Sequence, residues 1–157
     1  MKGGLDDLPI SRPTLDWGIP VPGADGHVMY VWVDALTNYI TGAGFPDESN
    51  PRWKYWPADV HFIGKDITRF HCALWPAMLW AAGEEAPRRV FAHGFVYIKN
   101  EETGEVQKIG KALGNVVEPM DIIKEFNAEA FRYYFLRQCP YPADGEFSWT
   151  LFRDTYN

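Results

Sequence analysis

The sequence predicts an α/β fold with a parallel sheet. Two short apolar stretches, residues 60–63 and 90–93, have the composition of buried strands. Each is followed by a glycine, Gly64 or Gly94, which allows a sharp turn out of the strand. Between them, apolar residues recur every three or four positions over residues 67–82, the spacing of a helix with one buried side. This alternation is typical of α/β folds, in which ligands bind at the carboxyl ends of the strands.

The helix expected over residues 67–82 has recognisable ends and one internal irregularity. Asp66 is a candidate N-cap, because a short acceptor side chain there can bond the first free amides. Gly83 is suited to end the helix, since glycine readily adopts the left-handed conformation of a C-terminal cap. Pro76 removes one backbone hydrogen bond from the interior and is expected to kink the axis.

Ile67, His71 and Trp75 are spaced four residues apart and therefore share one face of this helix. An isoleucine, an imidazole and an indole together would form a wall for a small, mostly apolar ligand with a polar end. The alternative is a core helix with one hydrogen-bonded histidine, and periodicity alone favours that alternative.

The first part of the chain predicts a connector, a strand and a helix. Residues 5–21 are rich in proline, which disfavours a helix there, and the Asp-Gly pair at 25–26 suits a type I′ hairpin turn. Residues 27–34 are mostly β-branched and aromatic and predict a strand. Residues 35–43 predict a short helix closed by Gly44. Four residues could border one cavity, although a core position is the better-supported interpretation of any single one: Trp32, Ala35, Leu36 and Tyr39.

A lysine-containing loop follows the second predicted strand. Residues 95–99 are expected to form an edge strand or a hairpin arm, turned by residues 100–104. Beyond it, Lys108 and Lys111 lie among small residues, and two ammonium groups on a flexible loop suit a polyphosphate during phosphoryl or nucleotidyl transfer. The alternative, an exposed turn with solvated lysines, is commoner for such a pattern. A P-loop is excluded, because Lys111 is followed by alanine instead of serine or threonine.

The last third of the chain predicts helices. Asp121 is expected to cap a helix over residues 122–126, and Asn127 a second helix over residues 128–138. Residues 147–156 predict the start of a further helix, and we expect that more chain follows in the whole protein. The inner side of the second helix would carry Phe131, Tyr134 and Phe135.

Composition excludes several classes of protein. The chain has 157 residues, of which 46% are hydrophobic and 16% aromatic, so it can form a domain with a core. A formal charge of −6 without a run of Lys and Arg excludes an autonomous nucleic-acid-binding domain. We expect a cytoplasmic location and no membrane partner, because no apolar run reaches about 18 residues and no signal segment is evident. Cys72 and Cys139 form no ligand-like cluster, so no metal site is expected.

Five separated blocks resemble methionyl-tRNA synthetases and occur in the order of that family. Five blocks in register are far less probable by chance than any one of them. The resemblance implies the C-terminal half of a Rossmann-like nucleotide-binding domain with parallel strands, followed by a helical segment like the family's stem-contact region. The blocks are Tyr-Val-Trp-Val-Asp-Ala at 30–35, His-Phe-Ile-Gly-Lys-Asp-Ile at 61–67, Phe-His and Trp-Pro-Ala within 70–77, Val-Phe-Ala-His-Gly at 90–94, and residues 108–115.

The resemblance also implies an activity and a role for individual residues. The chain would be part of methionine–tRNA ligase, a class I aminoacyl-tRNA synthetase that activates methionine with ATP as substrate, with Mg²⁺ accompanying the ATP. The family's methionine pocket is matched by Trp32, Ala35, Leu36, Tyr39, Ile67, His71 and Trp75. The ATP positions are matched by Gly64 and Asp66 at the ribose, His93, Gly94 and Val96 beside the adenine, and Lys108 and Lys111 at the phosphates. These two lysines, the expected catalytic residues, match those of the family's Lys-Met-Ser-Lys-Ser loop.

Departures from the family pattern limit what the chain is expected to do. The family's first signature, His-Ile-Gly-His, is absent from the sequence, and Gly110 and Ala112 replace both serines of the loop. We therefore expect the isolated chain to be inactive, and whether the altered loop supports catalysis stays open. The alternative is a non-catalytic, synthetase-derived module that binds a partner protein, methionine or a nucleotide.

The resemblance divides the chain into a connector and hairpin over residues 1–26, half of the Rossmann-like domain over 27–106, and the lysine loop with the stem-contact-like segment over 107–157. Contact with tRNA would occur only through domains outside this sequence. A parallel sheet cut in half exposes an apolar edge, so we expect association with a complementary N-terminal half or with a second copy.

Overall fold

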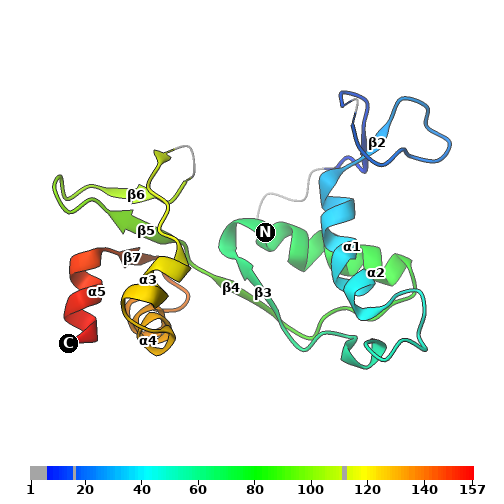
Figure 1. Ribbon diagram of the computed structural model, residues 1–157. Helices are drawn as coiled ribbons and strands as arrows, with labels where there is room; N and C mark the ends of the chain where they lie inside the picture. The colour runs from blue at the N-terminus through cyan, green and yellow to red at the C-terminus, as the bar shows by residue number, and fades with distance from the viewer. Residues whose placement is uncertain (1–6, 16, 111–112) are drawn as a thin grey trace. The chain divides into compact units, whose positions relative to one another are not determined.

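Two compact units make up the chain. The computed structural model describes residues 7–15, 17–110 and 113–157 (Figure 1). The first unit combines the chain up to Val60 with Arg69–Arg89, and the second combines His61–Thr68 with Val90–Asn157. None of the helices in the described ranges has the length and apolar character needed to cross a bilayer.

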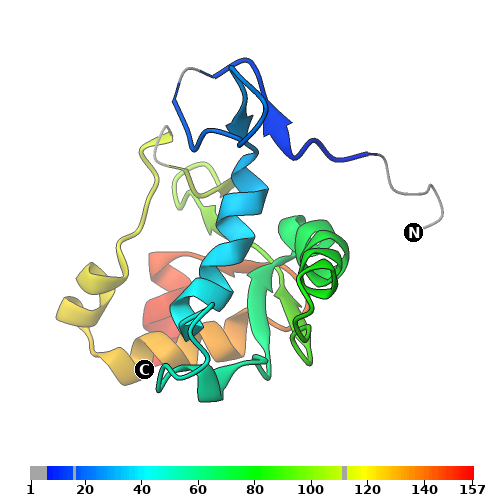
Figure 2. The same ribbon diagram turned by 90° about the vertical axis from the view of Figure 1, so that its right-hand side faces the viewer.

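The first unit is mainly helical. Its small antiparallel strand pair leads directly into the first long helix, as Figure 2 shows. Within the described part of residues 5–21 no helix forms, as the prolines predict. The elements are β1 (Ser11–Arg12), β2 (Val28–Met29), α1 (Val31–Ala43), the 3-10 helix η1 (Trp53–Tyr55), the π-helix η3 (Phe70–Leu74) and α2 (Trp75–Ala81).

The turn before β2 and the start of α1 differ from the prediction. The backbone N–H of His27 bonds the carbonyl of Ala24, but among these turn residues only Gly26 has a positive φ, so the turn is not type I′. The strand predicted over 27–34 is wrong beyond Met29, because α1 begins at Val31. Helical spacing buries Leu36 completely, which outweighs the weak strand preference of the preceding residues. Gly44 ends α1 as predicted, with φ of 112°.

The helix predicted over residues 67–82 is confirmed, because helical winding is continuous from Lys65 to Ala81, but the type of winding changes along its length. A 3-10 helix, η2 (Lys65–Ile67), comes first, and Gly64 rather than Asp66 is its N-cap, so the predicted cap is wrong. The π-turn η3 precedes Pro76, and its wider winding lets the N–H of Trp75 reach the carbonyl of Phe70. The helix is thus irregular directly before Pro76, while the predicted kink of its axis stays a prediction. Gly83 ends α2 as predicted, with φ of 81°.

The second unit contains two small sheets. β3 (His61–Gly64) and β4 (Val90–His93) pair in parallel, with Gly64 opposite His93. This confirms parallel strands at the predicted positions, with β3 shifted by one residue. β5 (Val96–Lys99) forms the predicted hairpin with β6 (Val106–Lys108). However, β5 also pairs in parallel with β7 (Gly145–Phe147), so it is the central strand of its sheet. Of the two predicted alternatives, the hairpin arm is confirmed and the edge strand is not.

Three helices complete this unit: α3 (Pro119–Glu125), α4 (Ala128–Gln138) and α5 (Trp149–Tyr156). Asp121 lies in the first turn of α3, whose N-cap is Glu118, so the predicted Asp121 cap is wrong. Asn127 caps α4 as predicted, because its Oδ1 accepts the N–H of Ala130 at 2.7 Å. The sequence did not predict β7, which occupies residues assigned to a loop and a helix start.

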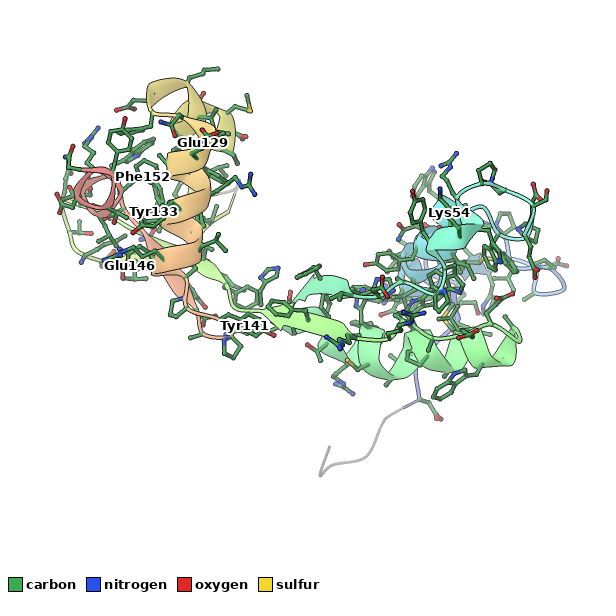
Figure 3. The ribbon with its side chains drawn as sticks, turned by 90° about the horizontal axis from the view of Figure 1, so that it is seen from below. Lys54, Glu129, Tyr133, Tyr141, Glu146 and Phe152 are labelled. Carbon is green, nitrogen blue, oxygen red and sulfur yellow. The ribbon has the colours of Figure 1, made fainter. Side chains whose placement is uncertain are left out.

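Each unit has its own hydrophobic core. Figure 3 labels Phe152, which is buried in the second core, and Tyr133, which is 52% exposed on α4. The inner stripe predicted for α4 is confirmed, because Tyr134 is buried there and Phe131 and Phe135 pack against the same core. The first core is formed by Leu36, Ile40, Trp75 and Leu79, and the second by Ile122, Tyr134, Phe147 and Phe152.

Candidate functional site

An aromatic and imidazole cluster occupies the first unit. Trp32 and Tyr39 lie on α1, His71 lies in η3, and Trp75 begins α2. The hydroxyl of Tyr39 and Nε2 of His71 are 2.9 Å apart and share a hydrogen bond. The ring centre of His71 is 5.6 Å from that of Tyr39 and 6.2 Å from that of Trp32. Residues predicted from two separate stretches are therefore brought together here.

Two sequence features produce this cluster. On α1, Trp32, Leu36 and Tyr39 recur at three- and four-residue intervals and so lie on one helix face. The π-turn at 70–74 places His71 opposite that face, and single π-turns within helices are frequent at functional sites.

The cluster is closed in this structure. His71 is 2% exposed and Trp75 only 1%. Trp32 stacks on Phe70 with ring centres 3.9 Å apart. From the sequence, no site role was predicted for Phe70. A cavity of about 340 Å³ touches Trp75, but its other lining residues, including Thr41, Met78 and Glu84, were not among those predicted.

The remaining predicted methionine-site residues are divided between the units. Ala35 is half-buried and Leu36 fully buried on α1. Ile67 ends η2, which belongs to the second unit.

The predicted ATP residues that the structure describes lie in the second unit, at or beside strand ends except for Asp66, which lies in η2. Gly64 and His93 are register partners at the ends of β3 and β4. Gly64 has φ of −71°, so the turn does not use the left-handed conformation that glycine permits, and the atom nearest to a Cβ built there is the side-chain Oδ1 of Asp66, at 2.7 Å. Nδ1 of His93, an exposed residue, hydrogen-bonds the carbonyl of Gly94 at 2.8 Å. Val96 begins β5.

A charged cluster surrounds Phe95 in the same unit. Lys108, at the end of β6, has its Nζ 4.9 Å from the centre of the Phe95 ring, and so has Lys65. Lys65 Nζ also donates to both carboxylate oxygens of Asp144, at 2.6 and 2.7 Å. Hydrogen bonds from Lys65 and from the Phe95 N–H hold the pKa of Asp144 below its ordinary value. Lys111, the second predicted lysine, lies outside the described residues.

Sequence reasoning did not find Lys65 and Asp144. They are separated by 79 residues, and neither position has a local pattern that indicates the other. Lys65 appeared only within a family motif, and Asp144 only as part of a turn. The sole sequence signal is Asp-Gly at residues 144–145, which is common in ordinary turns.

Metal binding has no evident site in the described ranges. Within them, no three His, Cys, Asp or Glu side chains come close enough together to hold an ion.

Comparison with known proteins defines the class to which these features belong. The whole sequence, residues 1–157, matches the family described as tRNA synthetases class I (M), so the chain belongs to the class I aminoacyl-tRNA synthetases. Within that class it is a member of the methionyl-tRNA synthetase family.

Individual relatives agree with this assignment. The chain is 55% identical over 148 residues to the methionine–tRNA ligase of Mesorhizobium japonicum and 52% identical to that of Brucella suis, covering 94% of this chain in each case. The structure of Mycobacterium tuberculosis methionyl-tRNA synthetase bound by methionyl-adenylate superimposes with a TM-score of 0.82 at 51% identity, covering 98% of this chain.

The chain spans only part of these relatives. It covers 27% of the Mesorhizobium enzyme, 28% of the Brucella enzyme and 29% of the Mycobacterium chain.

Proposed function

We propose that this chain supplies the methionine pocket and part of the ATP site of a methionine–tRNA ligase. The observation that carries the proposal is the hydrogen-bonded pair of Tyr39 and His71 within a ring cluster, in a chain that belongs to the methionyl-tRNA synthetase family. Aromatic rings suit a thioether, because sulfur–aromatic contacts are favourable. The imidazole supplies the polar end of such a pocket. The proposed methionine residues are Trp32, Ala35, Leu36, Tyr39, Ile67, His71 and Trp75.

Entry of methionine requires a ring to move. His71 and Trp75 are almost fully buried, so a ligand can reach them only after a neighbouring side chain has swung aside. Trp32 is the best candidate, because it is only half-buried, stacks on Phe70 and lies 6.2 Å from His71 between ring centres. The Tyr39 hydroxyl would keep the His71 imidazole in one orientation during this movement.

ATP would be bound by strand ends and lysines. We assign the ribose to Gly64 and Asp66 and the adenine to the His93–Gly94 strand end. The methionine carboxylate would attack the α-phosphate in line, pyrophosphate would leave, and the methionyl group would pass to tRNA. Positioning and charge neutralisation supply most of such catalysis. The proposed ATP set is completed by Val96 and by Lys108 and Lys111 at the phosphates.

At the level of the fold, we propose that residues 27–106 are half of a Rossmann-like domain, preceded by a connector and hairpin over 1–26. Residues 107–157 would be the lysine loop and stem-contact-like segment. Mg²⁺ would arrive with ATP, bound to its phosphates, and we assign no residue of this chain to it. Contact with tRNA would come from other parts of the enzyme, in the cytoplasm.

Methionine titration tests the proposed pocket. We expect calorimetry to detect methionine binding, and Tyr39→Phe to weaken it about three- to tenfold, the loss of one hydrogen bond. Tyr39→Phe keeps the ring, so the fold is preserved, and circular dichroism verifies this. Trp80→Ala, a change at a 69% exposed indole, is the control and should bind as the unsubstituted chain does. Equal affinity of Tyr39→Phe and the unsubstituted chain would refute the pocket.

A chimera tests the activity. In it, this chain replaces the matching stretch of the Mycobacterium tuberculosis enzyme, to which it is 51% identical. We expect the chimera to catalyse methionine-dependent ATP–pyrophosphate exchange, and a polypeptide of these 157 residues alone to show none, because it contains no His-Ile-Gly-His motif. Exchange by the 157-residue polypeptide would overturn the second expectation.

A non-catalytic module is the second candidate function. Gly110 and Ala112 in place of the two family serines favour it, because two hydroxyls that could bind phosphate are lost. An inactive chimera whose activity returns with Gly110→Ser and Ala112→Ser would support this alternative.

A further inference from the structure

We infer that Asp144 is a positioning residue for ATP. Its carboxylate holds Lys65 and the backbone N–H of Phe95, the residue before β5. The ammonium groups of Lys65 and Lys108 then lie beside the Phe95 ring and form a paired cation site for a polyphosphate. This inference rests on the proposed function, and it adds Lys65, Phe95 and Asp144 to the residues that serve the ATP side of that reaction.

One carboxylate joins three segments that are distant in sequence. Both oxygens of Asp144 accept from Lys65 Nζ, at 2.6 and 2.7 Å. Oδ1 also accepts the backbone N–H of Phe95, at 2.7 Å. The carboxylate therefore ties the helical turn after β3 to the residue before β5, and both to the turn before β7. Bonds to an ionised group are short and strong, so this arrangement holds its partners firmly.

The backbone delivers Asp144 to this position independently of the ion pair. The N–H of Gly145 bonds the carbonyl of Phe95 at 2.8 Å, continuing the parallel pairing of β5 with β7. Gly94 allows the close approach, because a Cβ there would collide with the backbone carbonyl of Ala143. Since the main chain is already placed, the carboxylate loses little further freedom on binding Lys65.

The charge around Phe95 suits a polyanion. Lys65 and Lys108 each lie 4.9 Å from the centre of the ring, and cations over an aromatic face are attracted to it. The ammonium groups of Lys65 and Lys108 together with the Asp144 carboxylate have a net charge of about +1 beside the strand ends. Asp144 thus fixes Lys65 without cancelling the field that a triphosphate would meet.

Two explanations of the Asp144 carboxylate predict opposite changes in ATP affinity when it is removed. If Asp144 positions Lys65 and Phe95, its removal weakens ATP binding. If it merely competes with phosphate for Lys65, its removal strengthens ATP binding. Asp144→Asn keeps an acceptor for the Phe95 N–H but loses the negative charge, so it separates the hydrogen bond to Phe95 from the ion pair with Lys65.

The experiment measures exchange kinetics of the chimera with Asp144→Ala, Asp144→Asn and Lys65→Met. We expect Asp144→Ala to raise the KM for ATP about tenfold or more and to leave the KM for methionine within about twofold. Asp144→Asn and Lys65→Met should have smaller effects in the same direction. The double variant Lys65→Met with Asp144→Ala should be no worse than Asp144→Ala alone, because both act through one pair. Asp59→Asn, which breaks the exposed pair of Asp59 with Arg88, is the control and should change neither KM.

A second measurement monitors the local structure around Phe95 instead of enzyme activity. Hydrogen exchange of the Phe95 amide in the 157-residue chain should accelerate in Asp144→Ala and stay slow in Asp144→Asn. An unchanged or lowered KM for ATP in Asp144→Ala overturns the inference, as does an equal rise in both KM values, which indicates general damage. An inactive parent chimera means instead that the proposed function fails, and the inference fails with it.

Discussion

At the scale of single residues, Tyr134 combines burial with one hydrogen bond. Its side chain is 1% exposed, and its hydroxyl donates to the carbonyl of Glu146 at 2.9 Å. Burial disfavours the tyrosinate and raises the pKa of Tyr134 to about 12. An unfolded chain releases this proton near pH 10 and the folded chain only near pH 12. The stabilisation is therefore complete below pH 10 and is lost as the pH rises from 10 to 12.

We predict a pH-dependent stability difference for Tyr134→Phe. At pH 8 the variant should lose about 1 kcal/mol of unfolding free energy, because the Glu146 carbonyl loses its donor. Above pH 10 the gap to the unsubstituted chain should shrink, since only the latter must keep the tyrosine protonated. Urea denaturation between pH 8 and 11.5 measures this, with Tyr133→Phe on the exposed side of α4 as control. A gap that stays constant over this range would contradict the prediction.

Two tryptophans of α2 form a natural pair for measuring burial. Trp75 is 1% exposed within the first core, whereas Trp80 is 69% exposed. We predict that Trp75→Ala lowers the free energy of unfolding by about 3–5 kcal/mol, because it leaves a large cavity. Trp80→Ala should stay within about 0.5 kcal/mol of the unsubstituted chain. Urea denaturation followed by circular dichroism compares them, and similar losses for both would mean that this core is wrongly placed.

At the scale of elements, Gly83 shows how backbone conformation decides the effect of a methyl group. Gly83 has φ of 81° and ends α2, whereas Gly42 lies within α1 and is not among the positive-φ glycines. No neighbouring atom lies within 4 Å of a Cβ built at either glycine, so an added methyl group meets no steric clash at either position. We predict that Gly83→Ala costs about 1–2 kcal/mol and that Gly42→Ala gains up to about 1 kcal/mol. Thermal unfolding measures both signs, and a loss in both variants would contradict the argument.

The elements that the sequence predicted well are those with a local physical cause. The ends of α1 and α2 follow from glycine, the start of α4 from the Asn127 side chain, and the β5–β6 hairpin from its turn. The early start of α1 was missed, because residues 31–34 have strand preferences that core packing overrides. The strand β7 was missed because its three residues pair only with a strand some 49 residues earlier.

The candidate site was predictable to a similar extent. Four-residue spacing placed His71 and Trp75 on one helix face, and Tyr39 was a separate candidate for a cavity border. The structure adds the hydrogen bond that joins Tyr39 to the His71 imidazole. Spacing could not predict that the cluster is closed, since the stack of Trp32 on Phe70 joins two distant helices. Family resemblance supplied methionine as the ligand, which the residues alone did not identify.

At the scale of the whole molecule, the two units carry different parts of the proposed chemistry. The ring cluster lies in the first unit with its own core, and the strand ends, Lys65, Lys108 and Asp144 lie in the second. Except for Ile67, which lies in the second unit, the proposed methionine residues can therefore be tested by substitutions in the first unit, and the described ATP residues by substitutions in the second. We expect pocket variants such as Tyr39→Phe to change methionine affinity and Asp144 variants to change ATP affinity.

The β3–β4 sheet has features that favour association with another chain. Among the described residues this sheet has two strands, and Phe62 on β3 is 71% exposed. Phe62 contacts Phe91 with ring centres 5.0 Å apart, and Phe91 stacks on Tyr141 at 3.7 Å, so the sheet presents a row of aromatic rings. Tyr141 is labelled beside β4 in Figure 3 and is 52% exposed. Open strand edges beside exposed apolar side chains favour pairing with another chain.

We therefore predict that the 157-residue chain self-associates as its concentration rises from micromolar to several hundred micromolar, when no complementary chain is present. Phe62→Ser should shift this association to at least about tenfold higher concentration, because it removes most of one exposed ring from the contact. Leu136→Ser, at an 83% exposed position on α4, removes a comparable apolar side chain away from the sheet and should leave association unchanged. Light scattering coupled to size-exclusion chromatography measures the mass of all three. A monomer at every concentration, or equal effects of the two substitutions, would show that the β3–β4 surface does not drive association.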